Sequence, residues 1–419
     1  MSCLSTRDIL SVACLTRRIA WGLIVARSGN RVTRTLLVMS TATLGEMLRK
    51  GNVWYSRHYE VYFDRVCVAF FIGAPRAPVA LGNTILVSIG TGRGSKIDLV
   101  LAPYSLYRLA RRIRATSYAT GDLVYSWWTN GLLKALLKAK IHLTPICIPE
   151  IIYKNTGRSL SGFLPIWFER VFILLSFKLA DKVVMPFRES AGDFFDWIVA
   201  YPSVKDKVVA VDAIVDDLPS MDFYQNLQLA PKMQPVSESG TIILVYVGRL
   251  SRDKLVDDLV RMMASIKSSG NTPRPMRLDI VGDGPELPRL KRLSEELGVE
   301  AMIRFVGTVP NEDLPRRLLA SDTFLSPFTG TSLREAALCG LPIVAYDMEW
   351  VRGVFKHHET ALLVPARDFK GMAEQVIRLA NDEQLRRELS RNVKELAWRL
   401  WSPQSLKSSL RQAYADDYQ

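Results

Sequence analysis

The sequence predicts an α/β protein of two domains, each built on a mostly parallel β-sheet. At 419 residues the chain is long for a single hydrophobic core. Short apolar, β-branched runs alternate with segments of helical composition, as in parallel strand–helix–strand crossovers. A stretch that is poor in periodic pattern, residues 219–240, separates two such series. We therefore expect one sheet on each side of this stretch.

Composition narrows the class of protein. The apolar share is 48% and the aromatic share 9%, which is typical of a packed globular protein. The five cysteines show no Cys-x-x-Cys spacing, and there are only four histidines. The sequence therefore predicts neither a zinc site nor a disulfide framework, and it favours a reducing, cytoplasmic compartment. The cysteines are Cys3, Cys14, Cys67, Cys147 and Cys339.

Positive charge is concentrated in the first half of the chain. Residues 1–235 hold 29 Lys and Arg against 17 Asp and Glu, whereas the remainder holds 26 against 25. This asymmetry suggests an anionic partner, which could be membrane lipid, a phosphorylated acceptor or nucleic acid. No recognised nucleic-acid module is present, so we do not expect nucleic acid. An ordinary solvated basic surface is the alternative.

Residues 1–33 are interpreted as an N-terminal extension. The most apolar stretch, Ile9–Ala26, is interrupted by Arg17-Arg18, so no transmembrane helix is expected there. It also lacks the small-residue cleavage site of a signal peptide. An amphipathic helix at a membrane interface and a poorly ordered leader both remain open.

The first domain is expected over residues 34–225. Phe163–Leu179 is interpreted as a core helix, with a membrane-dipping helix as the alternative. Lys134 and Lys138 are expected on one helical face because they are four residues apart. The expected strands are Arg34–Met39, Arg65–Phe71, Thr84–Ile89, Asp98–Leu101, Asp122–Ser126, Leu143–Ile148, Lys182–Met185 and Val208–Val211, and the expected helices are Thr43–Lys50, Tyr104–Arg114, Gly131–Lys140 and Phe163–Leu179.

A linker over residues 226–240 is expected to lead into a second domain, residues 241–400. Residues 401–419 are interpreted as a C-terminal helix, because Ser402 and Pro403 suit a helix cap and first position. The expected strands are Ile242–Val247, Arg277–Val281, Ile303–Val306, Thr323–Ser326, Ile343–Tyr346 and Ala361–Val364, and the expected helices are Lys254–Lys267, Pro285–Leu297, Glu312–Ala320, Leu333–Leu338, Asp368–Ala380 and Asp382–Arg399.

Ligands of parallel sheets bind at the carboxyl ends of the strands, and four such ends in the second domain are informative. Gly248 allows close approach of the backbone, and Arg249 and Lys254 in GRLSRDK are suited to a diphosphate. An ordinary charged loop is the alternative. GDGPE at residues 282–286 is a weak dinucleotide signal because its third glycine is absent.

The other two strand ends carry backbone and carboxylate groups. FVGT at residues 305–308 offers open backbone to a nucleobase. At residues 330–335 a Gly-Thr-Ser turn opens a helix whose free amides suit phosphate oxygens. Glu335 is expected in the first turn of that helix, where a carboxylate could bind sugar hydroxyls or merely complement the helix dipole.

Together GRLSRDK, VGDGPEL, FVGTV and SLREAALCGLPIVAYD resemble the second domain of the retaining, metal-independent glycosyltransferases of family 4. The resemblance is strong over residues 241–415, weaker over 180–186 and 207–216, and faint before residue 120. It implies a GT-B fold, in which two Rossmann-like parallel-sheet domains flank a cleft and the C-terminal helix returns to the first domain.

The resemblance also implies roles for individual residues. Arg249 and Lys254 would stabilise the donor diphosphate, and Gly248 would lie beside it. Val306 and Gly307 would meet the base, and Glu335 would bind the ribose. Phosphates and sugar would lie against Gly330, Thr331, Ser332 and Leu333.

The sequence departs from the family in three places. The family usually has two glutamates with seven residues between them, and counting back from Glu335 the first is replaced by Pro327. The glycine-rich loop after the first strand is replaced by Ser40–Thr43, and the histidine often seen in the first domain's cleft is absent from Thr144–Glu150, where Glu150 is a polar candidate. A nucleotide-binding scaffold without turnover is therefore the alternative function. A nicotinamide oxidoreductase resting on Gly282-x-Gly284 is disfavoured, because the fingerprint is incomplete.

The leading hypothesis is a cytoplasmic glycosyltransferase that uses a nucleotide-sugar donor and needs neither a metal nor another cofactor. Because the GT-B first domain handles the acceptor, its charge predicts a lipid-linked or phosphorylated acceptor and peripheral binding to the inner, anionic face of a membrane. The expected contacts are the basic stretches Arg108–Arg114 and Lys134–Lys140, with Trp127-Trp128 between them.

Overall fold

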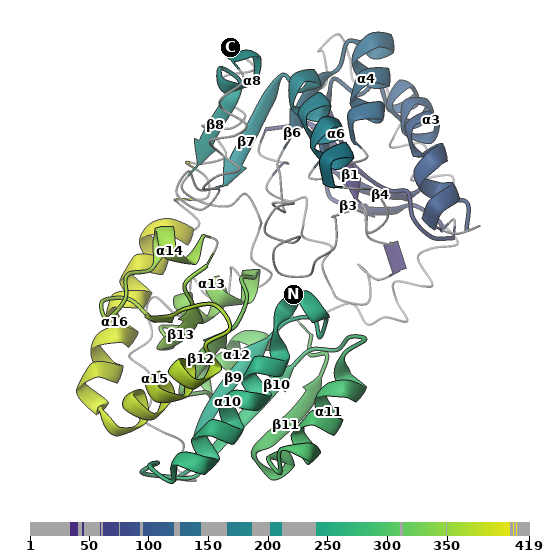
Figure 1. Cartoon of the computed structure of the whole chain (residues 1–419). Coiled ribbons are helices and arrows are strands. Elements are labelled where there is room, and N and C mark those ends of the chain that lie inside the picture. The colour runs from purple at the N-terminus through teal and green to yellow at the C-terminus, as the bar shows by residue number, and fades with distance from the viewer. Residues whose placement is uncertain are drawn as a thin grey trace.

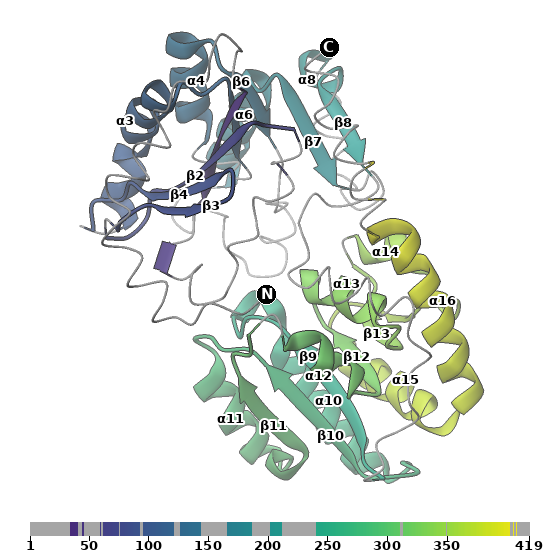
Figure 2. The same cartoon turned by 180° about the vertical axis from the view of Figure 1, so that it is seen from behind.

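The protein, seen here as a computed structural model, forms two lobes, each around its own β-sheet (Figures 1 and 2). The structure describes residues 34–40, 44–45, 59, 62–74, 76–92, 95–120, 126–143, 166–186, 202–211, 240–310, 313–348, 350–402, 405 and 408. The predicted leader, the linker and most of the predicted C-terminal helix lie outside these residues.

The first sheet has eight strands in the order β3-β4-β2-β1-β5-β6-β7-β8. All of its pairs are parallel except β3 with β4. Its strands are β1 (Thr35–Ser40), β2 (Arg65–Phe70), β3 (Val79–Leu81), β4 (Thr84–Ser88), β5 (Ser117–Thr120), β6 (Lys140–Leu143), β7 (Lys182–Pro186) and β8 (Val208–Val211).

Helices α3 (Ser95–Ile113), α4 (Ser126–Leu137) and α6 (Ile166–Leu179) pack side by side in that lobe, with α4 in contact with both of the others (Figure 1). A short α8 (Pro202–Lys205) precedes β8. Their inward side chains, including Leu106, Leu133 and Phe177, join strand residues in one buried cluster. This packing against the sheet leaves the opposite faces of the three helices outward.

The predicted strand Asp98–Leu101 is wrong, because these residues belong to α3, which continues through Pro103. The Asp98 carboxylate points inward and accepts hydrogen bonds from the N–H of Gly73 (3.1 Å) and from the N–H and hydroxyl of Thr91 (2.6 Å each). Val100 and Leu101 are exposed. The apolar run that suggested a buried strand is therefore partly an outward helix face.

The sequence also missed the strand that follows α3. The strand is Ser117–Thr120, which the four-residue run SYAT did not signal. The predicted Asp122–Ser126 lies outside the described residues except for Ser126, which begins α4. Trp127 and Trp128 are therefore helical.

Lys134 and Lys138 do not share a helical face, contrary to the prediction. Helix α4 ends at Leu137, and Lys138 has a left-handed backbone with φ of 52°. Lys134 Nζ instead lies 2.6 Å from the Asp181 carboxylate and donates to the Leu179 carbonyl. Lys134 thus ties α4 to the end of α6.

The second sheet has six parallel strands in the order β11-β10-β9-β12-β13-β14. Each lies within one residue of its predicted position, and the central strands β9, β12 and β13 are apolar on both faces, as buried parallel strands require. They are β9 (Ile242–Val247), β10 (Met276–Val281), β11 (Ile303–Gly307), β12 (Thr323–Ser326), β13 (Ile343–Tyr346) and β14 (Leu362–Val364).

Helices cover both faces of this sheet and bury two separate clusters. One cluster includes Leu259, Leu290 and Val376, and the other includes Leu333 and Val393. The helices are α10 (Val256–Ser269), α11 (Leu287–Glu296), α12 (Leu314–Leu319), α13 (Thr331–Leu338), α14 (Val351–Val354), α15 (Phe369–Asn381) and α16 (Glu383–Trp401), with the 3₁₀ turns η3 (Arg252–Lys254) and η4 (Glu300–Met302). The sequence missed α14 and both 3₁₀ turns.

Among the helices that the structure describes, none is long and apolar enough to span a bilayer.

Candidate active site

The order of the second sheet places a switch point between β9 and β12. These strands are neighbours, with Leu244 opposite Thr323 and Val245 opposite Phe324, although they are far apart in sequence. The connections that leave their carboxyl ends turn to opposite faces of the sheet, and ligands of such sheets bind at that point. The loops that meet there are residues 248–255 and 327–330, which overlap the strand ends predicted to bind a ligand at residues 248–254 and 330–335.

Glycines let the loops after β9 and β10 pack backbone against backbone. A Cβ on Gly282 would lie 1.9 Å from the Gly248 carbonyl oxygen, and one on Gly284 would lie 2.3 Å from that of Leu250. The backbone of Leu250 is held at both ends, because its N–H donates to the Asp283 carbonyl (3.0 Å) and its carbonyl accepts from the Glu286 N–H (3.0 Å). The glycines of GDGPE thus support the GRLSRDK loop.

Gly248 also leaves room for a buried tyrosine. A Cβ at this position would lie 2.5 Å from the hydroxyl of Tyr246, which points toward the Arg249 carbonyl at 3.4 Å. Burial raises the pKa of Tyr246, and the Asp253 carboxylate raises it further, so the hydroxyl stays neutral. The side chain of Arg249 itself is exposed.

Lys254 bridges the two loops of the switch point. It ends η3, and its Nζ lies 3.5 Å from the Thr329 carbonyl oxygen and 4.1 Å from the centre of the Phe328 ring. Asp253 Oδ2 is 3.6 Å away. The structure therefore brings Lys254 to the loop before α13, and its role at a diphosphate stays a prediction.

The amino end of α13 lies against the end of β9. Gly330 is its extended N-cap residue, and the Ser332 hydroxyl donates to the Val247 carbonyl at 2.7 Å. Thr331 is exposed and Leu333 is buried. The first amides of this helix and Lys254 consequently lie at the same end of the sheet.

Glu335 is not in the first turn of its helix, contrary to the prediction. Helix α13 begins at Thr331, so Glu335 is its fifth residue, and its exposed fraction is 3%. Helix-dipole effects fall off within the first turn, so the dipole-complementing interpretation loses its basis. The sequence misplaced the start because Thr331 and Ser332 resemble cap residues.

Val306 and Gly307 lie at the end of β11, two strands from β9. Gly307 adopts a φ of 80°, and its carbonyl accepts a hydrogen bond from the Gly282 N–H at 2.8 Å. The FVGT backbone is therefore partly engaged by the neighbouring loop. It lies at the same edge of the sheet as the other predicted site residues.

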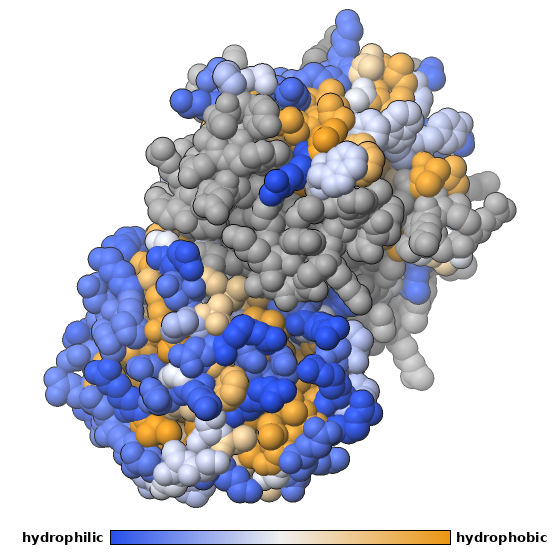
Figure 3. Space-filling model, in the orientation of Figure 1, coloured by the Kyte–Doolittle hydropathy of each residue, from blue (hydrophilic) through white to orange (hydrophobic). Residues whose placement is uncertain are grey.

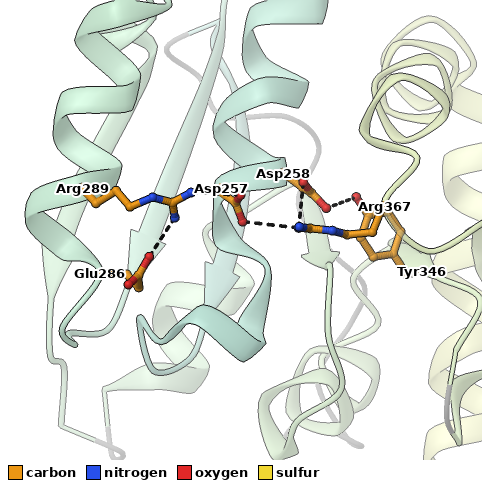
Figure 4. Close-up of polar contacts among 6 residues, drawn as sticks. All are labelled: Asp257, Asp258, Glu286, Arg289, Tyr346 and Arg367. Atoms are coloured by element: carbon orange, nitrogen blue, oxygen red, sulfur yellow. Dashed lines mark hydrogen bonds and ion pairs between the residues drawn. The ribbon is translucent and has the colours of Figure 1, made fainter. Parts of the chain in front are cut away.

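A polar network that the sequence did not reveal runs beside these loops (Figure 4). Asp258 Oδ2 accepts a hydrogen bond from the Tyr346 hydroxyl (2.8 Å), and Oδ1 accepts one from Arg367 Nη1 (3.1 Å). Asp257 lies between Arg367 (3.5 Å) and Arg289 (3.4 Å), and Arg289 also pairs with Glu286 (2.7 Å). The network joins the first turn of α10 to α11, to the end of β13 and to the residues before α15.

Burial governs the protonation of this network. Asp258 is 4% exposed, and desolvation raises the pKa of its carboxyl although the Tyr346 hydroxyl and the Arg367 charge oppose the rise. Burial likewise raises the pKa of Tyr346, and the Asp258 charge adds to the effect. The tyrosine is therefore a fixed hydrogen-bond donor. Because α10 follows directly on Lys254 and Leu255, the network anchors the far end of the GRLSRDK loop.

Within the described part of the chain no group of three or more His, Cys, Asp or Glu side chains is arranged to hold a metal ion. Pro327, at the position of the family's first glutamate, is buried in the loop that packs against Lys254. Of the two predicted diphosphate cations, Lys254 contacts the loop before α13, whereas Arg249 is exposed at the start of the loop after β9.

Comparison with known proteins matches this site to one family. Residues 232–396 match the model of the family described as "Glycosyl transferases group 1". The N-acetyl-alpha-D-glucosaminyl L-malate synthase of Bacillus anthracis is 27% identical over 201 residues, which is 46% of this chain and 50% of that protein. The chain thus spans about half the length of this curated relative.

Solved structures extend the likeness to both lobes. Sucrose-phosphate synthase from Thermosynechococcus elongatus superposes with a TM-score of 0.72 at 17% identity, over 92% of this chain and 99% of that one. HepE from Anabaena, solved with UDP and glucose, gives 0.66 at 15% identity, over 92% and 100%. The expected GT-B fold is confirmed, with two parallel-sheet domains.

Proposed function

Residues 232–396 match the model of the group 1 glycosyl transferases, and from that match we propose that the chain transfers a sugar from a nucleotide-sugar donor to an acceptor. The observation that carries the proposal is the contact between the loops after β9 and β12. Lys254 reaches the Thr329 carbonyl, and Ser332 reaches the end of β9. Cations and helix amides at one switch point suit a diphosphate.

Arg249 and Lys254 act on the leaving group. As the glycosidic bond breaks, negative charge develops on the nucleoside diphosphate, and fixed cations stabilise it. Lys254 is pre-positioned by the Phe328 ring and the Thr329 carbonyl, whereas the exposed Arg249 is free to move onto the phosphates when they bind. Gly248 and Gly330 to Leu333 line the phosphates and sugar.

The nucleoside is assigned to the neighbouring strand ends. Glu335 binds the ribose hydroxyls, and the backbone of Val306 and Gly307 meets the base. UDP is a reasonable first donor nucleotide because HepE was solved with it.

Retention of configuration and independence of a metal belong to the proposal. The diphosphate oxygen that leaves the sugar accepts the proton of the acceptor, so the protein needs no separate base. Product analysis by NMR should show the donor's anomeric configuration, and a chelator should leave the rate unchanged.

The acceptor is proposed to be lipid-linked or phosphorylated, and the protein to act at the inner, anionic face of a membrane. The excess of Lys and Arg over residues 1–235 supports this, because that half includes the sheet opposite the donor loops. The proposed division of the chain is unchanged: 34–225 for the acceptor, 241–400 for the donor.

Binding and turnover can be separated in one experiment. Calorimetry with UDP, GDP, UDP-glucose, GDP-mannose and NADH should show binding of one nucleotide family and none of NADH. Release of the nucleoside diphosphate is then measured with the bound donor and an acceptor extract.

Binding followed by release supports the enzyme. Binding without release by any extract supports the alternative favoured by Pro327, a nucleotide-binding scaffold. Binding of NADH alone, or of none of the nucleotides, would reject both.

A further inference from the structure

The first domain exposes large apolar side chains on its three packed helices. All the large hydrophobic side chains that are strongly exposed in the described part of the chain lie on α3, α4 and α6. They are Val100, Leu101, Tyr104, Trp128, Leu136, Trp167, Phe168, Val171 and Leu175, which we call the aromatic face. Exposure reaches 77% at Val100, 59% at Trp167 and 56% at Trp128, so these residues are not edges of the core.

Ring contacts make α4 and α6 one surface. Trp127 stacks on Phe172 with ring centres 5.2 Å apart, and Trp128 meets Trp127 edge-on at 5.6 Å. Trp167 stacks on Phe168 at 3.6 Å. In Figure 3 orange and pale side chains gather over this part of the upper lobe. Contiguous apolar patches of this kind mark interaction sites, because single exposed residues would be scattered.

Cations flank the aromatic face. The three helices contain seven Lys and Arg against two Asp and Glu, and one of those acids, Asp98, is turned inward. Arg108, Arg111 and Arg112 are exposed on the last turns of α3, and the Arg108 guanidinium lies 5.8 Å from the Tyr104 ring. Arg170 and Lys178 are exposed on α6.

Apolar and basic side chains are unevenly distributed along α3 and α6. On α3 the apolar residues Val100 to Tyr104 precede the arginines, and on α6 most of the aromatic face lies in the first two turns. Each helix starts at the carboxyl edge of its sheet, because each follows a parallel strand. The aromatic end of the face is thus the end nearest the edge where an acceptor would bind.

We infer that the aromatic face is the surface by which the protein docks on an anionic membrane. Tryptophan and tyrosine partition into the interface of a bilayer, and cations beside them are attracted to acidic lipid headgroups. A second copy of this chain fits less well, because two such faces would oppose like charges. The inference rests on the membrane attachment proposed above and assigns it to named residues.

The assignment differs from the sequence prediction. Lys134 was expected to contribute, but its ammonium is used by Asp181 and Leu179. The structure instead assigns the main membrane contacts to aromatic and aliphatic side chains on α3, α4 and α6. Docking should therefore persist in part at high salt, which a purely electrostatic contact would not do.

The test is co-sedimentation of the full chain with vesicles of phosphatidylcholine, alone or mixed with phosphatidylglycerol, over a salt series. The aromatic variant is Trp128→Ser with Trp167→Ser, and the cationic variant is Arg108→Gln, Arg111→Gln and Arg112→Gln. A charge-matched control removes three exposed cations from the second domain, with Lys291→Gln, Arg352→Gln and Lys356→Gln.

Wild type should bind the mixed vesicles. The aromatic variant should bind at least about tenfold more weakly at every salt concentration, since each indole loses its apolar burial. The cationic variant should lose about fivefold per cation at low salt and little at high salt. The control should bind as wild type does.

Thermal unfolding of the same proteins shows whether each variant is folded. Nucleotide calorimetry on them tests the proposed transferase separately from the docking surface. Absent vesicle binding by wild type, or equal binding by all variants, overturns the docking inference while nucleotide binding preserves the proposed function. Dimerisation of wild type that the aromatic variant abolishes also overturns it, in favour of a second copy. Vesicle binding without any nucleotide binding leaves the docking surface and rejects the transferase.

Discussion

The two domains use their polar and apolar side chains in opposite ways. In the second domain charged groups point at one another: Asp258 bonds Tyr346 and Arg367, and Asp257 lies between Arg367 and Arg289. Its described residues include no strongly exposed large hydrophobic side chain, whereas the described helices of the first domain carry a whole face of them. The contrast indicates that one domain is built to hold loops rigidly and the other to meet an apolar partner.

Removing the site cations should have the largest effect. We expect Arg249→Ala or Lys254→Met to lower turnover by ~100-fold or more, because the leaving diphosphate loses a fixed charge. Methionine keeps the apolar stem of Lys254 over the Phe328 ring. Steady-state rates are compared with Lys291→Met, an exposed lysine of α11. Near-normal transfer by a folded double variant would remove both residues from the mechanism.

Tyr346→Phe should destabilise the second domain by about 1.5–3 kcal/mol, because the buried Asp258 loses a hydrogen bond to a charged group. The matched control is Tyr246→Phe, whose hydroxyl makes only a long contact of 3.4 Å with the Arg249 carbonyl. Urea denaturation curves should show different free energies of unfolding for the two variants. Equal stability of both variants would show that the network of Figure 4 contributes no rigidity.

Glu335→Gln should weaken nucleoside diphosphate binding by about 1–3 kcal/mol, the scale of a charged hydrogen bond. The same change should matter little for a 2′,3′-dideoxy analogue, since the ribose hydroxyls are the proposed partners. Calorimetry with both ligands gives the comparison. A loss that is identical for the two ligands would assign Glu335 to packing.

Asp98 in the first domain and Asp258 in the second should contribute to stability with opposite dependence on pH. Hydrogen bonds from Thr91 and Gly73 outweigh desolvation and lower the pKa of Asp98, so its stabilisation is present above the unfolded value of ~3.9 and is lost as pH falls through the folded value. Burial raises the pKa of Asp258, so its stabilisation is present below ~3.9 and is lost as pH rises through the raised value.

Replacing each by asparagine removes its contribution to the pH dependence. From pH 3 to 8, the melting temperature of Asp98→Asn relative to wild type should fall, by a few degrees at most, and that of Asp258→Asn should rise. Parallel trends in the two variants would contradict the assigned environments.

The same contrast explains what the sequence could predict. The central strands β9, β12 and β13 are apolar on both faces, and glycines follow β9 and β10, so the strand positions and the placing of Arg249, Lys254 and Gly330 at one edge followed from pattern alone. Helix starts were less certain: Thr331 and Ser332 resemble caps, but the extended residue is Gly330. The roles of these residues stay predictions.

What failed depends on contacts between distant segments. Asp258 meets Tyr346 and Arg367 across 88 and 109 residues, and no local pattern encodes such pairs. In the first domain the outward apolar side chains of α3 mimicked a buried strand, and the short β5 gave too little signal. Periodicity assumes that apolar means inward, and a docking face violates that assumption.

The adjacency of β9 and β12 has a consequence for synthesis of the chain. Strand β9 ends at Val247, but its neighbour on one side begins only at Thr323, so the ribosome must make a further ~75 residues before that edge is paired. At about 5–20 residues per second this takes roughly 4–15 s, during which a central, apolar strand has an open edge. Slow translation beyond Val247 should therefore favour aggregation of the nascent second domain, and a chaperone that covers exposed strand edges should be needed most during that interval.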